Sequence, residues 1–314
     1  YERGVPMDFQ KKIQEIRHGA EGVLLGKELQ IREVLCAFLA GGNVLLVDVP
    51  GTGKTTLAKA FAGLLSLDSR RIQFTPDVMP SDLTGFSVYR PDKGEFVYEE
   101  GELFKNLVLA DEINRANTKT QSALLEAMEE HQITVEGVTR ELPNPFMVIA
   151  TQNPVGAEGT QALPEAEVDR FMISLSLGFP DEESEISMAK HSSRKQAVDD
   201  LTPVISKEEF LEMQDACEEV TITDELYSYI ARLVRATRTD ESLLRGASPR
   251  ATLSLVRMAK ASAFADERDF VIPSDIMQQF PYVIGHRLTL TREAEESQVS
   301  RTEVIERLLS EVKQ

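Results

Sequence analysis

The residues best suited to chemistry form a glycine-rich segment that ends in a lysine and two threonines. In full it is Asp48-Val49-Pro50-Gly51-Thr52-Gly53-Lys54-Thr55-Thr56, and it lies between an apolar run, Val44 to Val47, and a segment with helical periodicity. Gly51 and Gly53 allow backbone N–H groups to turn toward a phosphate chain, and the helix that follows directs its positive end at the same anion. Lys54 can reach β and γ phosphate oxygens, and the Thr55 hydroxyl suits Mg²⁺. We therefore expect this segment to bind a nucleoside triphosphate, with 50–56 as the contact residues.

The first position of this segment departs from the usual pattern. A phosphate-binding loop of this type opens with glycine, and here Asp48 stands in that position. Because the position lies at the end of the preceding strand, we expect the loop to keep its phosphate-binding shape. A glycine-rich turn that resembles the motif by chance is the alternative, and the strand before it, the helix after it and the Lys-Thr pair all count against that interpretation.

Two consecutive carboxylates follow another apolar strand, Leu107 to Ala110. An Asp at the tip of a strand can hold Mg²⁺ through water, and the next carboxylate can polarise a water for attack on the γ-phosphate. We assign Asp111 to the nucleotide-bound metal and Glu112 to the water. Paired acids after a strand are also common in helix-capping turns. Their combination with the phosphate-binding loop favours the catalytic interpretation.

A third strand end supplies a polar amide. The run Phe146 to Thr151 leads into Gln152-Asn153-Pro154, so Asn153 would lie beside the nucleotide if this strand lies between the other two. Its amide could then orient the attacking water. Asparagine before proline is also a routine turn signal, and this alternative stays open at the level of sequence.

The order of apolar segments predicts an α/β region followed by a helical one. Apolar residues at three-to-four spacing predict two helices between Phe9 and Ala40, broken around Gly22 to Gly26. Five strand-like runs separated by helical segments predict a mostly parallel sheet: Val44 to Val47, Arg71 to Phe74, Leu107 to Ala110, Phe146 to Thr151 and Met172 to Leu177. From residue 206 the periodicity is helical, with start signals at Ser206, Thr223, Ser248 and Ser274. We expect domains at 1–180 and 206–314, joined by a connection at 181–205 that contains a helix.

Several segments together resemble the MoxR family of AAA+ ATPases. They are Arg71 to Asp77, Pro80 to Gly85, Leu109 to Ala116, Lys119 to Met128, Ala150 to Pro154, Glu158 to Thr160 and Leu163 to Phe171. The likeness extends from about Leu24 through the helical region. It implies a P-loop NTPase core in the form of an αβα sandwich, an all-helical lid domain, ATP and Mg²⁺ as cofactors, and a homo-oligomeric ring that is usually a hexamer.

The same resemblance assigns roles to three residues. In that family the asparagine of the Ala-Thr-Gln-Asn-Pro segment is sensor 1, which falls on Asn153. The arginine of the Asp-Arg-Phe segment, here Arg170, reaches a neighbour's γ-phosphate, and the arginine after Ser-Pro, here Arg250, is sensor 2. An arginine supplied across an interface raises the rate about 10³- to 10⁵-fold, so hydrolysis would require assembly. Arg250 would lean from the lid onto the phosphates. Without the family, an ion pair of Arg170 with Asp169 or Glu167 is the simpler interpretation.

Two further segments resemble insertions of that family. Thr75 to Phe104 interrupts the α/β region with glycines and alternating aromatic residues, and Ile133 to Leu142 alternates around Gly137 as a hairpin would. In related machines such loops carry nucleotide-driven motion to a client protein. A solvated hairpin with only a packing role is the alternative.

Composition restricts the partners and the location. The chain has 52 acidic and 34 basic residues and a formal charge of -18, which would repel nucleic acid or an anionic membrane. Cys36 and Cys217 lie far apart in apolar or amphipathic stretches, so we expect buried, reduced thiols. The longest apolar run, Val44 to Val49, is too short to cross a bilayer, so we expect a cytoplasmic location.

Two classes of function remain at this stage. The first, implied by the resemblance, is a chaperone-like ATPase that remodels or matures a client protein, often together with a protein that carries a von Willebrand factor A (VWA) domain. The second is a nucleic-acid motor or loader with the same core, which the acidic charge and the lack of an aromatic-basic stripe disfavour. A small-molecule kinase would need an acceptor pocket, whereas here a large second region follows the whole core.

Overall fold

A five-stranded parallel sheet lies at the centre of the computed structural model, which describes residues 7–49, 51–153, 163–190 and 198–313. Its strands are β1 (Val44–Val47), β2 (Ser69–Gln73), β5 (Leu107–Asp111), β8 (Met147–Gln152) and β9 (Ile173–Leu175). Every neighbouring pair is parallel, in the order β2-β5-β8-β1-β9. Each strand overlaps one of the five runs expected from the sequence, so the predicted sheet is confirmed.

Both faces of the sheet are buried because successive residues belong to two different apolar cores. On β1, Val44 and Leu46 face one core and Leu45 faces the other. The first core includes α1 (Met7–Glu21), α2 (Glu28–Leu39) and α3 (Lys54–Leu64), and the second includes α4 (Pro80–Thr84) and α5 (Thr118–Glu130). Burial on both sides explains why these strands are continuous apolar runs. The result is the expected αβα sandwich, with the two predicted N-terminal helices.

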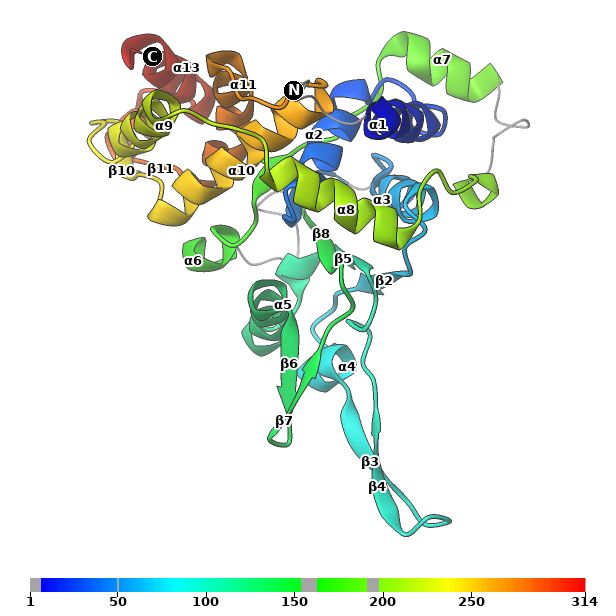
Figure 1. Ribbon diagram of the computed structural model, residues 1–314. Coiled ribbons are helices and arrows are strands. Elements are labelled where there is room, and N and C mark those ends of the chain that lie inside the picture. Colours follow the sequence, from blue (N-terminus) through cyan, green and yellow to red (C-terminus); the bar gives the residue numbers. More distant parts are fainter. Residues whose placement is uncertain (1–6, 50, 154–162, 191–197, 314) are drawn as a thin grey trace.

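The region after β9 is helical and gathers on one side of the sheet, near both chain ends (Figure 1). Its helices are α7 (Glu182–Lys190), α8 (Lys207–Glu218), α9 (Asp224–Ala236), α10 (Pro249–Ala265), α11 (Pro273–Ile284), α12 (Arg292–Glu296) and α13 (Arg301–Glu311), with the short turns η2 (Val198–Asp200) and η3 (Gly285–Arg287). One detail departs from the all-helical expectation, since β10 (Leu243–Arg245) pairs with β11 (Thr289–Leu290).

In the described part of the chain, no helix combines the length and hydropathy needed to span a bilayer.

Three of the four predicted helix starts are confirmed. Ser206, Thr223 and Ser248 are the residues directly before α8, α9 and α10. The prediction for Ser274 is wrong, because α11 already begins at Pro273, a residue that fits the first helical position since it has no amide to leave unpaired. The backbone N–H of Ile272 donates instead to the carboxylate of Asp275 at 2.8 Å, which closes this helix start.

Two hairpins extend away from the helical region (Figure 1). The longer one consists of β3 (Phe86–Arg90) and β4 (Glu95–Glu99), and the shorter one of β6 (Gln132–Val135) and β7 (Val138–Glu141), so both predicted insertions are present. They touch each other: the Ser87 hydroxyl donates to Glu136 at 2.5 Å, and the Arg140 guanidinium lies 3.5 Å from the centre of the Tyr98 ring. The two hairpins are therefore linked to one another outside the main body.

Both cysteines are free and buried, as expected from the sequence. Burial raises the pKa of the Cys217 thiol to about 12 and raises that of Cys36 as well. Both thiols are therefore protonated at neutral pH and belong to the apolar core rather than to a reactive site.

Candidate functional site

The glycine-rich segment follows the carboxyl end of β1 and opens helix α3. Gly51 and Gly53 have φ values of 89° and 96°, a backbone region that favours glycine. The Lys54 side chain is almost buried, and the hydrogen bond described for its ammonium is a long one, 3.4 Å to the carbonyl oxygen of Asp48. A buried ammonium with one weak acceptor fits an anionic ligand, since burying a charge is costly without a partner.

The remaining residues of the segment lie close to that ammonium in the chain. Thr52 is buried and donates to the carbonyl of Val49 at 3.4 Å, while Thr55 and Thr56 are half-buried in the first turn of α3. Pro50 lies outside the described residues. The helix start, its free N–H groups and Lys54 together form a site for phosphate groups.

Asp111 ends β5 beside this segment. One of its oxygens accepts a hydrogen bond from the Thr151 hydroxyl at 2.6 Å, and the other accepts from the Arg71 guanidinium at 2.6 Å and 3.1 Å. Thr151 comes from β8 and Arg71 from β2, the two strands on either side of β5. The carboxylate is therefore held in place by both neighbouring strands.

Glu112 is the most constrained residue of the site. Its φ of 58° lies in the left-handed region, which is uncommon for a non-glycine residue. Its carboxylate accepts hydrogen bonds from Arg115 at 2.9 Å, Gln73 at 3.0 Å and Asn153 at 3.1 Å. The bond from Arg115, with a smaller contribution from Asn153, holds the pKa of Glu112 below its usual range. The group is therefore ionised at neutral pH and can accept a proton.

Asn153 meets the condition set by the sequence, because β8 lies between β1 and β5. Its amide nitrogen contacts Glu112, and its backbone carbonyl accepts from the Asn114 side chain at 3.3 Å. Its side-chain oxygen is buried and has no hydrogen-bond partner among the described residues, which exclude 154–162. A buried amide oxygen next to an ionised carboxylate is suited to hold a water molecule, which would satisfy it.

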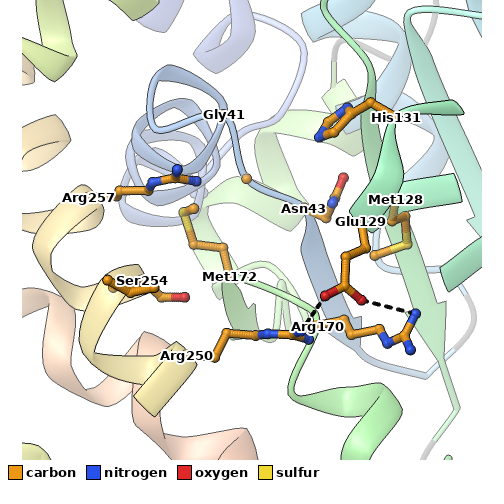
Figure 2. Close-up of a pocket in the computed structure, with 12 residues that line it drawn as sticks. Gly41, Asn43, Met128, Glu129, His131, Arg170, Met172, Arg250, Ser254 and Arg257 are labelled. Carbon is orange, nitrogen blue, oxygen red and sulfur yellow. Dashed lines mark hydrogen bonds and ion pairs between the residues drawn. The ribbon is translucent and has the colours of Figure 1, made fainter. Parts of the chain in front are cut away.

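Two arginines lie together at a different place. Arg170 follows the short helix α6 (Glu165–Val168), Arg250 lies in the first turn of α10, and both pair with the carboxylate of Glu129 near the end of α5. Figure 2 shows Glu129 between the two guanidinium groups. A guanidinium nitrogen of Arg170 lies 3.3 Å from a carboxylate oxygen of Glu129. The sequence-based alternative, an ion pair of Arg170 with Asp169 or Glu167, differs from the structure, in which Arg170 pairs with Glu129 and Asp169 pairs with Arg287.

The arginines line a cavity of about 220 Å³ that also includes Gly41 and Asn43. These two residues precede β1, whereas the phosphate-binding segment follows it. The cavity thus lies at the amino edge of the sheet and the nucleotide site at the carboxyl edge, about 13 Å apart along the four residues of β1 at about 3.3 Å per residue. The expectation that Arg250 leans onto the phosphates of its own chain is not met in this structure.

A buried ion pair holds the segment that carries Arg170. The Arg287 guanidinium, from η3, donates to the Asp169 carboxylate at 2.7 Å and to the carbonyls of Phe171 and Met172 at 2.6 Å and 3.2 Å. Asp169 also accepts from the hydroxyl of Ser248, which caps α10. Charge-assisted bonds between buried groups fix geometry strongly. Both arginines are therefore anchored to the same junction between sheet and helical region.

Sequence reasoning missed several of these residues. Arg71, Gln73, Arg115 and Thr151 orient the two carboxylates, Glu129 joins the two arginines, and Arg287 anchors their segment. Arg115 carried a local signal, since it lies three residues after Glu112. Arg71 and Gln73 alternate on a strand, which predicts a common face. Glu129 and Arg287 carried none, because their partners are distant in sequence.

Comparison with known proteins agrees with this arrangement. Residues 43–173 match the family model for the ATPase family associated with various cellular activities (AAA), and residues 235–308 match the model for the AAA lid domain. The chain is 44% identical to YeaC of Bacillus subtilis over 93% of its own length and 91% of that protein. It is 39% identical to the chaperone MoxR1 of Mycobacterium tuberculosis, over 92% and 79% of the two chains. A solved structure from Cytophaga hutchinsonii, described as a putative ATPase, superimposes with a TM-score of 0.91 at 41% identity, covering 97% of this chain and 95% of that one.

Proposed function

The chain belongs to the MoxR family of AAA ATPases, and on this premise we propose that it hydrolyses ATP in a ring whose neighbouring subunits complete one another's sites. The observation that carries the proposal is the separation of the site into two halves. Glu112 and Asn153 lie beside the phosphate-binding segment, while Arg170 and Arg250 lie at the opposite edge of the sheet. In a ring, the amino edge of one subunit can face the carboxyl edge of the next.

Within one subunit, the phosphate-binding half would hold ATP and Mg²⁺. Lys54 and the backbone amides that follow Gly51 would bind the β- and γ-phosphates. The Thr55 hydroxyl would contact Mg²⁺ directly and Asp111 would do so through water, once the carboxylate of Asp111 exchanges its contact with Arg71. The buried Lys54 and the two-sided support of Asp111 favour these assignments.

Glu112 and Asn153 would prepare the water for attack. The carboxylate is ionised, and its oxygen that contacts the Asn153 amide lies next to the unpaired amide oxygen of that residue. A water between them could donate one hydrogen to each acceptor, which would orient its lone pair toward the γ-phosphorus. Arg115 competes for the same carboxylate and would have to loosen for the proton to be accepted.

Arg170 and Arg250 would act on the nucleotide of the neighbouring subunit. Guanidinium groups stabilise the charge that develops on a transferring phosphoryl group. In the single chain the same two groups share Glu129, a carboxylate that occupies the position an anion would take (Figure 2). On assembly the neighbour's γ-phosphate would replace Glu129 as their partner.

We further propose a chaperone-like role on a client protein, together with a VWA-domain partner. The related MoxR1 is named a chaperone, and the two linked hairpins extend from the ATPase body as a partner-binding element would (Figure 1). A net charge of -18 disfavours a nucleic-acid partner. Stimulation of ATPase activity by a VWA-domain protein, and none by single-stranded DNA, is the expected result.

The Glu112→Gln variant tests the ATPase proposal. It should bind ATP with near-normal affinity and hydrolyse it about 10²- to 10⁴-fold more slowly, the usual contribution of a general base. Lys54→Ala should lose binding instead, and Glu126→Gln, an exposed position on α5, is the control. Unchanged turnover in Glu112→Gln would contradict the assignment. A pull-down with this slow variant should retain the client protein.

A further inference from the structure

Asp48 takes the position where the phosphate-binding motif usually has glycine, and its side chain is buried. The carboxylate accepts three hydrogen bonds: from the Ser176 hydroxyl at 2.8 Å, from the backbone N–H of Leu177 at 2.7 Å and from the backbone N–H of Gly178 at 3.1 Å. None of these residues belongs to the phosphate-binding segment. They form the stretch that leaves β9 and leads toward the helical region.

The backbone of Asp48 faces the nucleotide side. Its carbonyl oxygen accepts the hydrogen bond from the Lys54 ammonium, and its N–H donates to the carbonyl of Gln152, the residue before Asn153. One residue thus contacts the phosphate-binding lysine, the strand that carries Asn153 and the outgoing chain. A change in the position of Lys54 on phosphate binding would act directly on the peptide unit that carries the Asp48 side chain.

The outgoing stretch is held at a second point and contains a glycine in the left-handed region. The buried Lys27 ammonium donates to the carbonyl of Phe179 at 2.8 Å. Gly178 has a φ of 61°, a backbone region that glycine enters at little cost. Two residues beyond Phe179, the Asp181 carboxylate accepts from the N–H of Ser184 and so fixes the start of α7. Movement at 176–178 would therefore reach the first helix after the sheet.

We propose that Asp48 is a positioning residue that couples phosphate binding at the glycine-rich loop to the chain segment leading into the helical region. The proposal rests on the proposed ATPase function. A carboxylate suits this position because it can satisfy three donors of the outgoing stretch at once, whereas the usual glycine offers none. The same contacts explain why an anionic residue is tolerated beside a phosphate site. The carboxylate points away from that site and accepts three hydrogen bonds.

Hydrogen–deuterium exchange with and without ATPγS and Mg²⁺ tests the coupling. In the wild-type protein the nucleotide should slow exchange in α3 and also in peptides that cover 175–185. In Asp48→Asn, where an amide N–H₂ meets the Leu177 N–H in place of an acceptor, α3 should still be protected and the 175–185 response should be lost. A purely structural role would raise exchange in both states and leave the nucleotide-dependent difference unchanged.

Activity provides the second readout. Asp48→Asn should lower kcat at saturating ATP and keep ATPγS binding, because the segment 176–178 would no longer respond to the bound phosphate. Asp68→Asn, an exposed aspartate, is the matched control. Ser176→Ala removes one of the three donors without disturbing the loop, so it should give a partial loss of the response even if Asp48→Asn folds poorly.

The outcomes separate the two proposals. If ATPγS protects nothing in the wild-type protein, the ATPase proposal fails. If it protects α3 and 175–185 equally in the wild type, Asp48→Asn and Ser176→Ala, the ATPase proposal stands and the role of Asp48 is refuted.

Discussion

The two edges of the sheet hold different residues of the proposed ATPase site. At the carboxyl edge, Lys54, Asp111 and Glu112 are suited to a nucleotide, a metal and a water, and the arginines that contact them, Arg71 and Arg115, are bound to the carboxylates themselves. At the amino edge, Arg170 and Arg250 surround a small cavity in which Glu129 is their anionic partner (Figure 2). The lysine and the two acidic residues thus lie at one edge, and the two arginines lie at the other.

Neither edge of one subunit holds all of the residues that we propose for ATP hydrolysis. Arg170 and Arg250 are anchored through Asp169 and Arg287 to a buried junction, so they are not free to swing around the sheet to their own phosphate site. The distance between the edges is set by β1, a fixed element of the core. We propose that a second subunit completes the site, and the following variants test that proposal.

The Arg170→Ala change should have the largest effect. An arginine supplied in trans contributes about 10³- to 10⁵-fold to the rate of phosphoryl transfer, so kcat should fall by about that factor while nucleotide affinity stays nearly normal. Steady-state ATPase assays and titration with a fluorescent nucleotide measure the two quantities. Arg257→Ala is the matched control, since Arg257 lines the same cavity and has no described ion pair. Equal losses in both variants would mean that general positive charge matters and not the paired arginine.

Arg250→Ala should have the next largest effect. Hydrogen bonds to charged groups contribute about 1.5–3 kcal/mol, which corresponds to a loss of about 10- to 150-fold in kcat. If Arg250 served its own subunit, the loss would appear at every protein concentration. If Arg250 acts on the nucleotide of the neighbouring subunit, the difference from wild type should disappear at protein concentrations too low for assembly. A dilution series of specific activity distinguishes the two cases.

Glu129→Gln should have a smaller effect of opposite sign. Exposed ion pairs are worth about 0.2–1 kcal/mol each, so releasing two arginines should lower the protein concentration for half-maximal activity about two- to thirtyfold. Glu130→Gln, the adjacent exposed position, is the control. A higher half-maximal concentration in Glu129→Gln would show that this carboxylate supports the ring instead of standing in for phosphate.

Mild acid should lower the stability of the protein through His286. Burial holds the pKa of His286 well below 6.5, and this side chain lies against the carbonyl of Phe171, beside Arg170. Below pH 6.5 the unfolded chain takes up a proton that the native chain does not, so stability should fall by up to about 1.4 kcal/mol per pH unit and be unaffected by His286 above pH 7.5. Glu112, whose pKa is lowered, stays ionised over this range.

Denaturant unfolding at pH 7.5, 6.5 and 5.5 measures this slope. A His286→Gln variant should lose the His286 contribution, and His18→Gln, an exposed histidine on α1, should keep it. The same acid sensitivity in wild type and His286→Gln would contradict the assignment of this histidine to the junction.

The carboxyl edge could be predicted from sequence because parallel strands end there together. Lys54, Asp111 and Asn153 each follow an apolar run, and the sheet brings these run ends to one edge whatever the details of packing. Local motifs therefore identified all of these positions. The five strands were predictable for the same reason, since burial on both faces leaves a run of apolar residues with no polar interruption.

The amino edge could not be predicted in this way. Glu129 and Arg250 are separated by 121 residues, and their contact depends on how α10 docks on the end of α5. Likewise, nothing near Asp48 in the sequence indicates its partners at 176–178, which β9 brings alongside β1. The misplaced start at Ser274 has a local cause: Pro273 and Asp275 provide a better helix start than the serine between them.

Mixing two inactive variants tests directly whether neighbouring subunits complete one another's sites. Glu112→Gln keeps its arginines, and Arg170→Ala keeps its nucleotide site, so an interface that joins the intact halves should hydrolyse ATP. With random assembly of equal amounts, about a quarter of the interfaces would be of this kind. The account predicts that the mixture regains a substantial part of wild-type activity after subunit exchange. A mixture no more active than the average of its two components would contradict it.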